Sequence, residues 1–399
     1  MPYRKSAPID SPPVWNDPPC GPTITLRLKT ITPMFGGGYQ TREPDDDVPV
    51  RAAAIRGQLR HWWRATAGAK CATPDELFRR EAEIWGAAAA EGKPGGPGRV
   101  SIRVRDVQPG KRLSATEFIP TPDPQIGPRQ GTFLFPFQEQ KKDGIPPANC
   151  LFGTAFTLDV QFDDPDLADD VESALVAWVL FGGVGARTRR GCGALQAKGW
   201  DRLPKDSNEV KAWVRGYQDL PKRDWPTLAL AVLGSPSRDA MTAWETLGRF
   251  WSAFRKGHIF GDAYSPMSGG KWRDHAKLLG LRPYDQKIDL VKPYLGLPII
   301  YQKFPKSERQ VFSGTLEPAD SGRFASPVIL KPIALGEQVF PAVLALKGPA
   351  PSQIRVGDRN QAIDLNLPRD EPLLRNTPVQ TVILEADRFF KSLSSGGTR

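Results

Sequence analysis

Three arginines, Arg56, Arg60 and Arg64, follow one another at four-residue spacing. On a helix they share one face, so three guanidinium groups would stand in a row about one turn apart. Such a row of like charges repels itself, and a polyphosphate would relieve the repulsion because planar guanidinium groups suit phosphate oxygens. The alternative is a solvated cationic face paired to acidic residues elsewhere, which the spacing allows equally. Trp63, at the border of the apolar side, could support a base or seal the core.

A second basic segment, residues 181–193, combines five glycines with three arginines. Glycine permits close backbone approach and positive φ, so the segment predicts a loop whose amides and guanidinium groups clamp a phosphate backbone. It lacks the Gly-Lys-Ser/Thr ending of a Walker loop, and it follows a helix instead of opening one as a dinucleotide fingerprint does. The alternative is a flexible connector between a helix and a strand. The residues expected to contact nucleic acid in this loop are Gly183, Gly185, Arg187, Arg189 and Arg190.

Acidic side chains that could serve catalysis gather at Asp45, Asp46 and Asp47, in the loop expected before the first helix. A carboxylate there could act with a metal or as a general base, whereas a solvated acidic loop is the simpler interpretation. His61, on the basic helix, could act in metal-independent cleavage beside a 2′-hydroxyl, but the sequence indicates no acid partner for it. With three histidines and four isolated cysteines in the chain, we expect no metal site, no cofactor and no disulfide framework.

The composition indicates a basic protein with long irregular loops. Its 399 residues include 38 glycines and 40 prolines, carry a net charge of +10 and have a pI near 9.4. Such an excess favours a polyanionic partner, nucleic acid before membrane. The longest uncharged apolar run, residues 174–186, is too short to span a bilayer, and prolines replace the apolar core of a secretory signal at the N-terminus. We therefore expect a cytoplasmic protein that does not contact membranes.

Hydrophobic periodicity predicts six elements in the first half of the chain. Their order is strand, helix, strand, strand, helix, strand, at residues 23–31, 49–66, 99–107, 151–162, 165–181 and 194–200. This is the ferredoxin-like split βαβ pattern, an architecture that also underlies RNA-recognition modules. Residues 108–150 form an excursion too long for an ordinary connector, so we expect it to be functional or partner-bound.

The second half is predicted to be a decorated copy of the first. Its expected strands lie at 227–233, 295–301, 327–335 and 339–346, and its expected helices at 237–255 and 380–393. The predicted fold class is therefore α+β, with two ferredoxin-like, RRM-like modules and long loop insertions. The expected boundaries are a proline-rich arm at 1–22, a first module at 23–200, a linker at 201–224 and a second module at 225–399.

Three segments together resemble the repeat-associated (RAMP) proteins of CRISPR systems. They are Ile55-Arg56-Gly57-x-Leu59-Arg60-x-Trp62-Trp63-Arg64, the preceding Thr30-x-Thr32-Pro33-Met34-Phe35-Gly36-Gly37, and the loop from Phe181 to Gly193. The double tryptophan with this loop is most similar to the first RAMP subunit of the type III-B Cmr complex, as are Leu295–Pro298 and Gly322–Pro327 more weakly. The arm 1–22 has no counterpart there, and the glycine loop expected in the second half is not evident.

The resemblance implies a non-catalytic subunit of an RNA-guided antiviral effector, with other RAMP subunits of the Cmr complex as partners. Such a subunit holds the 3′ part of the guide RNA and helps to capture complementary target RNA, while base pairing supplies the specificity. The residues then expected to bind RNA are Gly36, Gly37, Arg56, Arg60, Trp63, Arg64, Gly183, Gly185, Arg187, Arg189 and Arg190. Two other hypotheses stay open: an endoribonuclease using Asp45–Asp47 or His61, and a scaffold whose arginines meet acidic protein partners.

Overall fold

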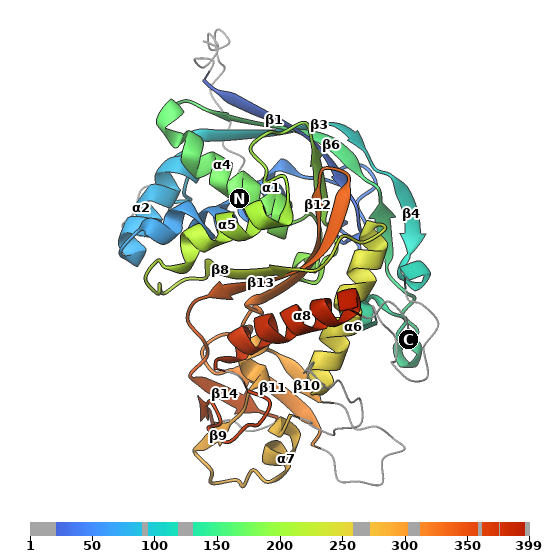
Figure 1. Cartoon of the computed structure of the whole chain (residues 1–399), viewed down its shortest axis with the longest axis vertical. Coiled ribbons are helices and arrows are strands. Elements are labelled where there is room, and N and C mark those ends of the chain that lie inside the picture. The colour runs from blue at the N-terminus through green and yellow to red at the C-terminus, as the bar shows by residue number, and fades with distance from the viewer. Residues whose placement is uncertain are drawn as a thin grey trace, which may run out of the picture.

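The structure, a computed structural model, is that of an α+β protein (Figure 1). It describes residues 21–89, 95–118, 131–257, 272–301, 312–357, 361–374 and 376–395. Most of the predicted arm, residues 1–20, and part of the 108–150 excursion, residues 119–130, lie outside the described residues. No helix within the described ranges is both long enough and apolar enough to cross a membrane.

The first half is built on a four-stranded antiparallel sheet in the order β3-β6-β1-β7. Its strands are β1 (Thr23–Thr30), β3 (Val100–Gln108), β6 (Ala155–Phe162) and β7 (Leu195–Lys198). Helix α1 (Ala52–Ala65) follows β1, and helix α4 (Ala168–Phe181) follows β6. The elements therefore appear in the predicted order. Alternate residues of β1 are buried, as a strand with one solvated face requires.

The helices on this sheet begin and pack for local reasons. In α1, Ile55, Leu59 and Trp62 recur at helical spacing and are buried. Helix α2 (Pro74–Trp85) begins where the side chain of Thr73 accepts a hydrogen bond from the amide of Glu76 at 3.2 Å. Helix α2 lies beside α1, and this neighbour decides the surroundings of the arginine row.

A three-stranded antiparallel sheet forms the centre of the molecule, in the order β12-β13-β8. Its strands are β8 (Thr227–Leu233), β12 (Val328–Leu335) and β13 (Gln338–Lys347). Every residue of β12 is buried, because α4 and the first half cover one face while α6 (Ala240–Lys256) and α8 (Pro378–Ser395) cover the other (Figure 1). The two halves thus share a continuous apolar interior rather than meeting only at a linker.

The stretch 201–224, which we expected to be a linker, contains helix α5 (Ser207–Gln218). The Asp206 side chain caps this helix by accepting hydrogen bonds from two backbone amides at its start. Val210 and Val214 are then buried one turn apart, and α5 packs on β8. The spacing of Val210 and Val214 indicates a helix, but the polar residues around them made this pattern weak in the sequence.

Short strands complete the structure. A five-stranded sheet, at the bottom of Figure 1, has the order β10-β11-β14-β15-β9 and its own apolar core. Its strands are β9 (Lys287–Asp289), β10 (Ile299–Tyr301), β11 (Gly314–Pro318), β14 (Gln353–Val356) and β15 (Ile363–Asn366), next to α7 (Asp274–Leu279). A small sheet β2-β5-β4, formed by Met34–Phe35, Asn149–Phe152 and Lys111–Ser114, joins the excursion to the first half. Short helical turns at Ala67–Lys70 (η1), Ala115–Phe118 (η2), Gly131–Leu134 (α3), Phe135–Phe137 (η3), Lys141–Asp143 (η4), Pro165–Leu167 (η5), Thr188–Arg190 (η6) and Lys292–Leu295 (η7) connect these elements.

Candidate nucleic-acid interface

The predicted arginine row on α1 faces helix α2. Nε of Arg60 and Nη1 of Arg64 donate to the same atom, Oε1 of Glu81, at 2.6 and 2.7 Å. Arg56 donates from Nη1 to the carbonyl oxygen of Trp85 at 3.0 Å, at the end of α2, where the helix dipole favours a cation. These contacts fit the structural alternative, because a buried carboxylate relieves the repulsion within the row. Arg60 and Arg64 keep 33% and 35% of their side chains exposed, and phosphate binding by the row stays a prediction.

Trp63 lies in the core of the first half. Its side chain is fully buried, and Nε1 donates to Oδ1 of Asp170 at 2.6 Å. Asp170 also accepts a hydrogen bond from Nη2 of Arg80 at 3.2 Å. A ring that solvent does not reach cannot stack on a base, so the prediction that Trp63 contacts RNA is wrong. Its side chain seals the core, which was the other possibility.

The glycine–arginine loop, residues 182–193, is fixed in place by the segment that follows β1. Oγ1 of Thr32 donates to the carbonyl oxygen of Gly191 at 2.6 Å, and the amide of Ala186 donates to the carbonyl oxygen of Phe35 at 2.7 Å. Gly185 has a φ of +81°, and a Cβ atom there would lie 2.5 Å from that same Phe35 oxygen. Only glycine allows this approach. The loop is therefore a positioned element, which favours the predicted binding loop over the flexible connector that was the alternative.

Two loop arginines are tied to the second half of the chain. Nη1 of Arg190 donates to the carbonyl oxygen of Val328, the first residue of β12, at 2.7 Å. Nη1 of Arg189 donates to the carbonyl oxygen of Ser326 just before it. Neither partner is a carboxylate, so these contacts position the guanidinium groups without neutralising their charge.

Other arginines in this region also contact partners that carry no negative charge. The Arg190 guanidinium lies 4.7 Å from the ring centre of Trp251 on α6, and Arg255 lies 5.9 Å from the same ring. Nε of Arg187 is buried and has no hydrogen-bond partner among the described residues. A buried donor without a partner is costly, so Arg187 would gain from an acceptor supplied by a ligand.

A cleft of about 940 Å³ lies in front of the loop, between the two halves. Within the described part of the chain, arginines are the only charged residues that line it, and no Asp or Glu is among its lining residues. The lining consists of Gln58, Phe135, Pro136, Gln138, Gly185, Arg187, Thr188, Arg189, Arg190, Trp251, Arg255, Leu295, Gly296, Leu297, Pro298, Ile299, Ile300, Arg323, Phe324, Ala325 and Ser326. Five guanidinium groups thus converge on one concave surface.

Four of these arginines have lowered pKa values. Burial first, and the neighbouring guanidinium groups second, lower the pKa of Arg190 to about 9. Burial also lowers the pKa values of Arg187, Arg189 and Arg255 from the usual value for arginine. The site therefore raises the free energy of the charged forms of all four groups. An anion in the cleft would lower that free energy.

The far wall of the cleft is made by the two second-half motifs. Leu297 and Phe324 exchange backbone hydrogen bonds of 2.9 and 3.1 Å, which bring the segments 295–298 and 322–327 together. Arg323 in the second segment is exposed and lines the cleft. The structure therefore gathers motifs from both halves of the sequence into one site.

Only part of the predicted RNA-binding set reaches this cleft. Gly185 and the three loop arginines line it, whereas Gly36, Gly37 and Gly183 are not among its lining residues. A Cβ atom on Gly183 would lie 2.6 Å from the carbonyl oxygen of Gly193, so packing alone requires glycine there, and its contact with RNA stays a prediction. The sequence reasoning missed Arg255, Arg323 and Phe135. The motif containing Arg323 and the unusual length of the 108–150 excursion were available signals, while α6 gave none.

Two of the three candidate catalytic aspartates are engaged in ion pairs. Asp45 forms an ion pair with Arg51 and accepts hydrogen bonds from the amides of Asp47 and Val48, and these contacts lower its pKa. Asp46 forms an ion pair with Arg112 of β4. The described residues contain no cluster of His, Cys, Asp and Glu able to hold a metal ion. The acidic loop thus has a structural role that its sequence left open.

His61 lies on α1 with its ring 5.3 Å from that of Trp62. Burial first, then the charges of Arg189 and Arg64, lower its pKa to about 3. The imidazole is therefore neutral at physiological pH. In the described part of the chain, no carboxylate is seen to orient it.

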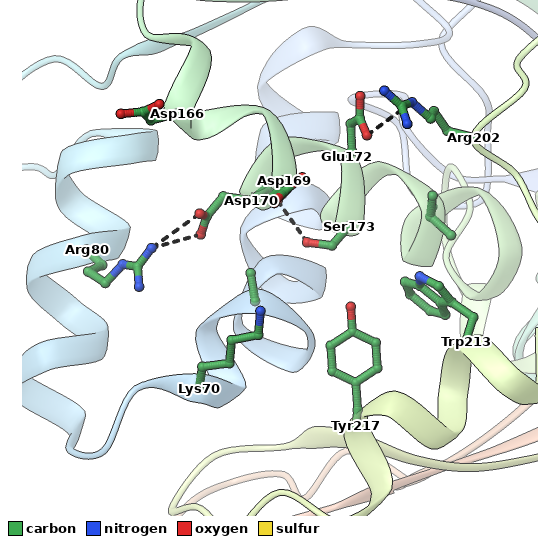
Figure 2. A pocket seen from close by; sticks show the side chains of 12 residues that line it. Lys70, Arg80, Asp166, Asp169, Asp170, Glu172, Ser173, Arg202, Trp213 and Tyr217 are labelled. Carbon is green, nitrogen blue, oxygen red and sulfur yellow. Dashed lines mark hydrogen bonds and ion pairs between the residues drawn. The ribbon is translucent and has the colours of Figure 1, made fainter.

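A second pocket, of about 440 Å³, lies between α2, α4 and α5 (Figure 2). Unlike the cleft, it is lined by charges of both signs, including four carboxylates. Arg80 pairs with Asp170 at 3.2 Å, and Arg202 pairs with Glu172 at 3.4 Å. Its carboxylates make it a poor phosphate site and leave the arginine cleft as the candidate interface.

Comparisons with known proteins agree with the motifs. Residues 27–196, a segment that includes the glycine–arginine loop, match the RAMP superfamily. The prediction that the chain is similar to RAMP proteins is confirmed.

Several solved structures have a similar fold. The fold resembles the crystal structure of Cmr1 from Pyrococcus furiosus in its apo form, with a TM-score of 0.50, 16% identity, and coverage of 82% of this chain and 88% of that one. A chain from a type III-B Cmr-beta complex bound to cognate target RNA aligns with a TM-score of 0.43, 14% identity, and coverage of 81% and 94%. Among curated proteins, no sequence match is found.

Proposed function

We propose that this chain is an RNA-binding subunit of a type III-B CRISPR effector complex and that it holds guide RNA in the cleft between its halves. The observation that carries the proposal is the convergence of five arginines with no carboxylate among the described residues that line the cleft. Guanidinium groups bind phosphate oxygens in a planar, two-pronged geometry. Contacts of this kind recognise the backbone whatever the sequence, as a subunit that accepts many guides requires.

The architecture of the subunit belongs to the same proposal. We infer two ferredoxin-like modules, of which the first has the full series β1, α1, β3, β6, α4, β7. In the second, β8, α6, β12, β13 and α8 follow the same order, and a fourth strand is missing from its described residues. The five-stranded sheet is inserted between these elements. The cleft then lies at the junction of two related modules, each contributing arginines.

The finer assignment follows the family resemblance. The bound segment is the 3′ part of the guide RNA, and complementary target RNA is captured beside it. The partners are other RAMP subunits of the Cmr complex, in the cytoplasm.

The subunit itself is proposed to be non-catalytic. Asp45 and Asp46 form ion pairs with arginines. The pKa of His61, about 3, lies far below the value near 7 that suits a general acid at neutral pH. Purified chain incubated with RNA should leave the RNA intact. Cleavage that is lost on Asp45→Asn or His61→Gln would establish the endoribonuclease alternative.

The binding site is tested by reversing an exposed charge in the cleft. Arg323→Glu should weaken the binding of a single-stranded RNA of about 12 nucleotides, measured by fluorescence anisotropy at several salt concentrations. The loss should be similar for unrelated sequences, and the salt dependence should fall by about one counterion. Because Arg323 is exposed, the variant should fold normally.

Arg202→Glu is the matched control, since it makes the same charge change at an exposed residue of the other pocket. It should leave the affinity within about twofold of the unchanged protein, apart from a small general effect of net charge. Equal affinities for RNA in the Arg323→Glu and unchanged proteins would refute the cleft as the binding site.

A further inference from the structure

An aromatic side chain is exposed at the rim of the arginine cleft. Phe135 is 60% exposed and lines the cleft together with Ile300, which is 64% exposed. Phe135 belongs to the 108–150 excursion, so this segment of the first half reaches the mouth of the cleft. Exposed large apolar groups beside a charged concave surface mark an interaction site more often than a random surface does.

The neighbours of Phe135 anchor it firmly. Phe133 and Leu134, directly before it, are fully buried. The ring of Phe133 packs 6.2 Å from that of Trp244 on α6, and Phe137 stacks on Phe35 at 4.2 Å. Both sides of Phe135 are therefore held by the core while its own ring faces outward.

One guanidinium group completes this support. Arg42 donates to three backbone carbonyl oxygens of the excursion, those of Pro136 at 2.6 Å, Gln138 at 2.6 Å and Pro146 at 3.1 Å. An arginine has its donors in a fixed fork, so these three bonds fix the backbone that carries Phe135. An exposed ring on such a rigid support loses little conformational entropy when it binds a ligand.

We propose that the cleft takes an unpaired RNA strand and that one base of this strand stacks on Phe135 while the arginines hold the adjoining phosphates. The proposal rests on the function proposed above and specifies its ligand as single-stranded. In a duplex, the faces of the bases are hidden within the stack, and only unpaired bases can lie on an aromatic side chain. Stacking also requires no particular base, in keeping with a guide-binding role.

The cleft itself favours one strand over two. Its volume of about 940 Å³ is in the range of pockets that enclose a drug-sized molecule, which corresponds to a few nucleotides rather than a duplex. The apolar rim and the guanidinium groups together match the two chemical faces of a single strand, bases on one side and phosphates on the other. Positive charge with aromatic side chains is the combination found in single-strand binding grooves.

The test compares a single-stranded RNA of about 12 nucleotides with a blunt duplex of the same length. Phe135→Ala should weaken single-strand binding by about 5- to 150-fold with an unchanged salt dependence, because no phosphate contact is lost. Phe135→Trp should retain binding. Duplex binding should not change in either variant. Tyr284→Ala, at an aromatic residue that is 66% exposed away from the cleft, should bind like the unchanged protein.

The outcomes separate the two proposals. If Arg323→Glu weakens RNA binding but Phe135→Ala does not, the cleft binds RNA and the stacking inference is overturned. If Phe135→Ala weakens duplex and single-strand binding equally, the preference for an unpaired strand is overturned. If Arg323→Glu has no effect, the proposed function fails first. Thermal unfolding should be nearly the same in all four variants, since Phe135, Tyr284 and Arg323 are exposed.

Discussion

Nζ of Lys331 donates a hydrogen bond of 2.6 Å to the carbonyl oxygen of Gly182. A second bond of 2.9 Å reaches the carbonyl oxygen of Val179. Lys331 lies on β12 in the second half and is almost fully buried, whereas both acceptors lie at the C-terminal end of α4 in the first half. Its amino group therefore occupies the negative end of the helix dipole, directly before the glycine–arginine loop.

Replacement of this lysine should weaken the junction between the halves. Lys331→Met keeps the side-chain length but leaves two buried carbonyl oxygens without donors, so the free energy of unfolding should fall by about 1–3 kcal/mol. Urea denaturation measures the change. Lys347→Met is a suitable comparison, because Lys347 also bonds to backbone oxygens, at the end of α5, but near the surface. An equal or smaller effect at Lys331 would contradict the role of burial.

The arginine row on α1 yields a prediction that separates structure from binding. Glu81→Gln keeps the shape of the side chain and removes the charge that Arg60 and Arg64 share. Stability should fall by about 1–3 kcal/mol, because a mostly buried carboxylate that accepts two guanidinium donors is lost. RNA affinity should hardly change if the row is structural. A marked gain in affinity would instead indicate that the freed arginines reach phosphate.

The elements with strong local signals could be predicted from the sequence. Strand β8 occupies the predicted residues 227–233, and α1 and α4 lie within the predicted helices. In each of them, the apolar residues follow a clear pattern along the segment, and the fold keeps the type of element that this pattern predicts. The glycine–arginine loop could also be identified, because glycines interspersed with arginines are typical of a backbone that closely approaches a polyanion.

The remaining features depend on tertiary contacts that one sequence does not encode locally. Strands β9 and β15 have only three and four residues, too few for a periodic pattern. Trp63 was ambiguous because a tryptophan at the border of a helix face becomes core or surface according to its neighbours, and here α4 supplies Asp170 to it. Arg255 and Phe135 reach the cleft from distant segments, so only the fold brings them beside the loop.

The lowered pKa of His61 predicts a pH dependence of stability. In the unfolded chain its pKa is near 6.5, and in the folded chain burial and two arginine charges lower it to about 3. Between these values the unfolded state binds a proton that the folded state does not. The free energy of unfolding is therefore undiminished by this histidine above about pH 6.5, and it decreases progressively as the pH falls toward 3. The melting temperature should therefore fall less between pH 7.0 and pH 5.0 for His61→Gln than for the unchanged protein. Equal losses would contradict the assignment.

The crowded cleft predicts a conflict between stability and binding at Arg255. This residue packs against Trp251 beside Arg190, and burial lowers its pKa from the usual arginine value. Arg255→Met removes a partly desolvated like charge and retains an unbranched side chain, so the protein without RNA should gain about 0.5–2 kcal/mol of stability. RNA affinity should fall in the same variant, because one cation facing the phosphates is gone. Urea denaturation and anisotropy on a single preparation test both effects. A variant that loses stability while keeping its affinity would mean that Arg255 supports the fold and takes no part in RNA binding.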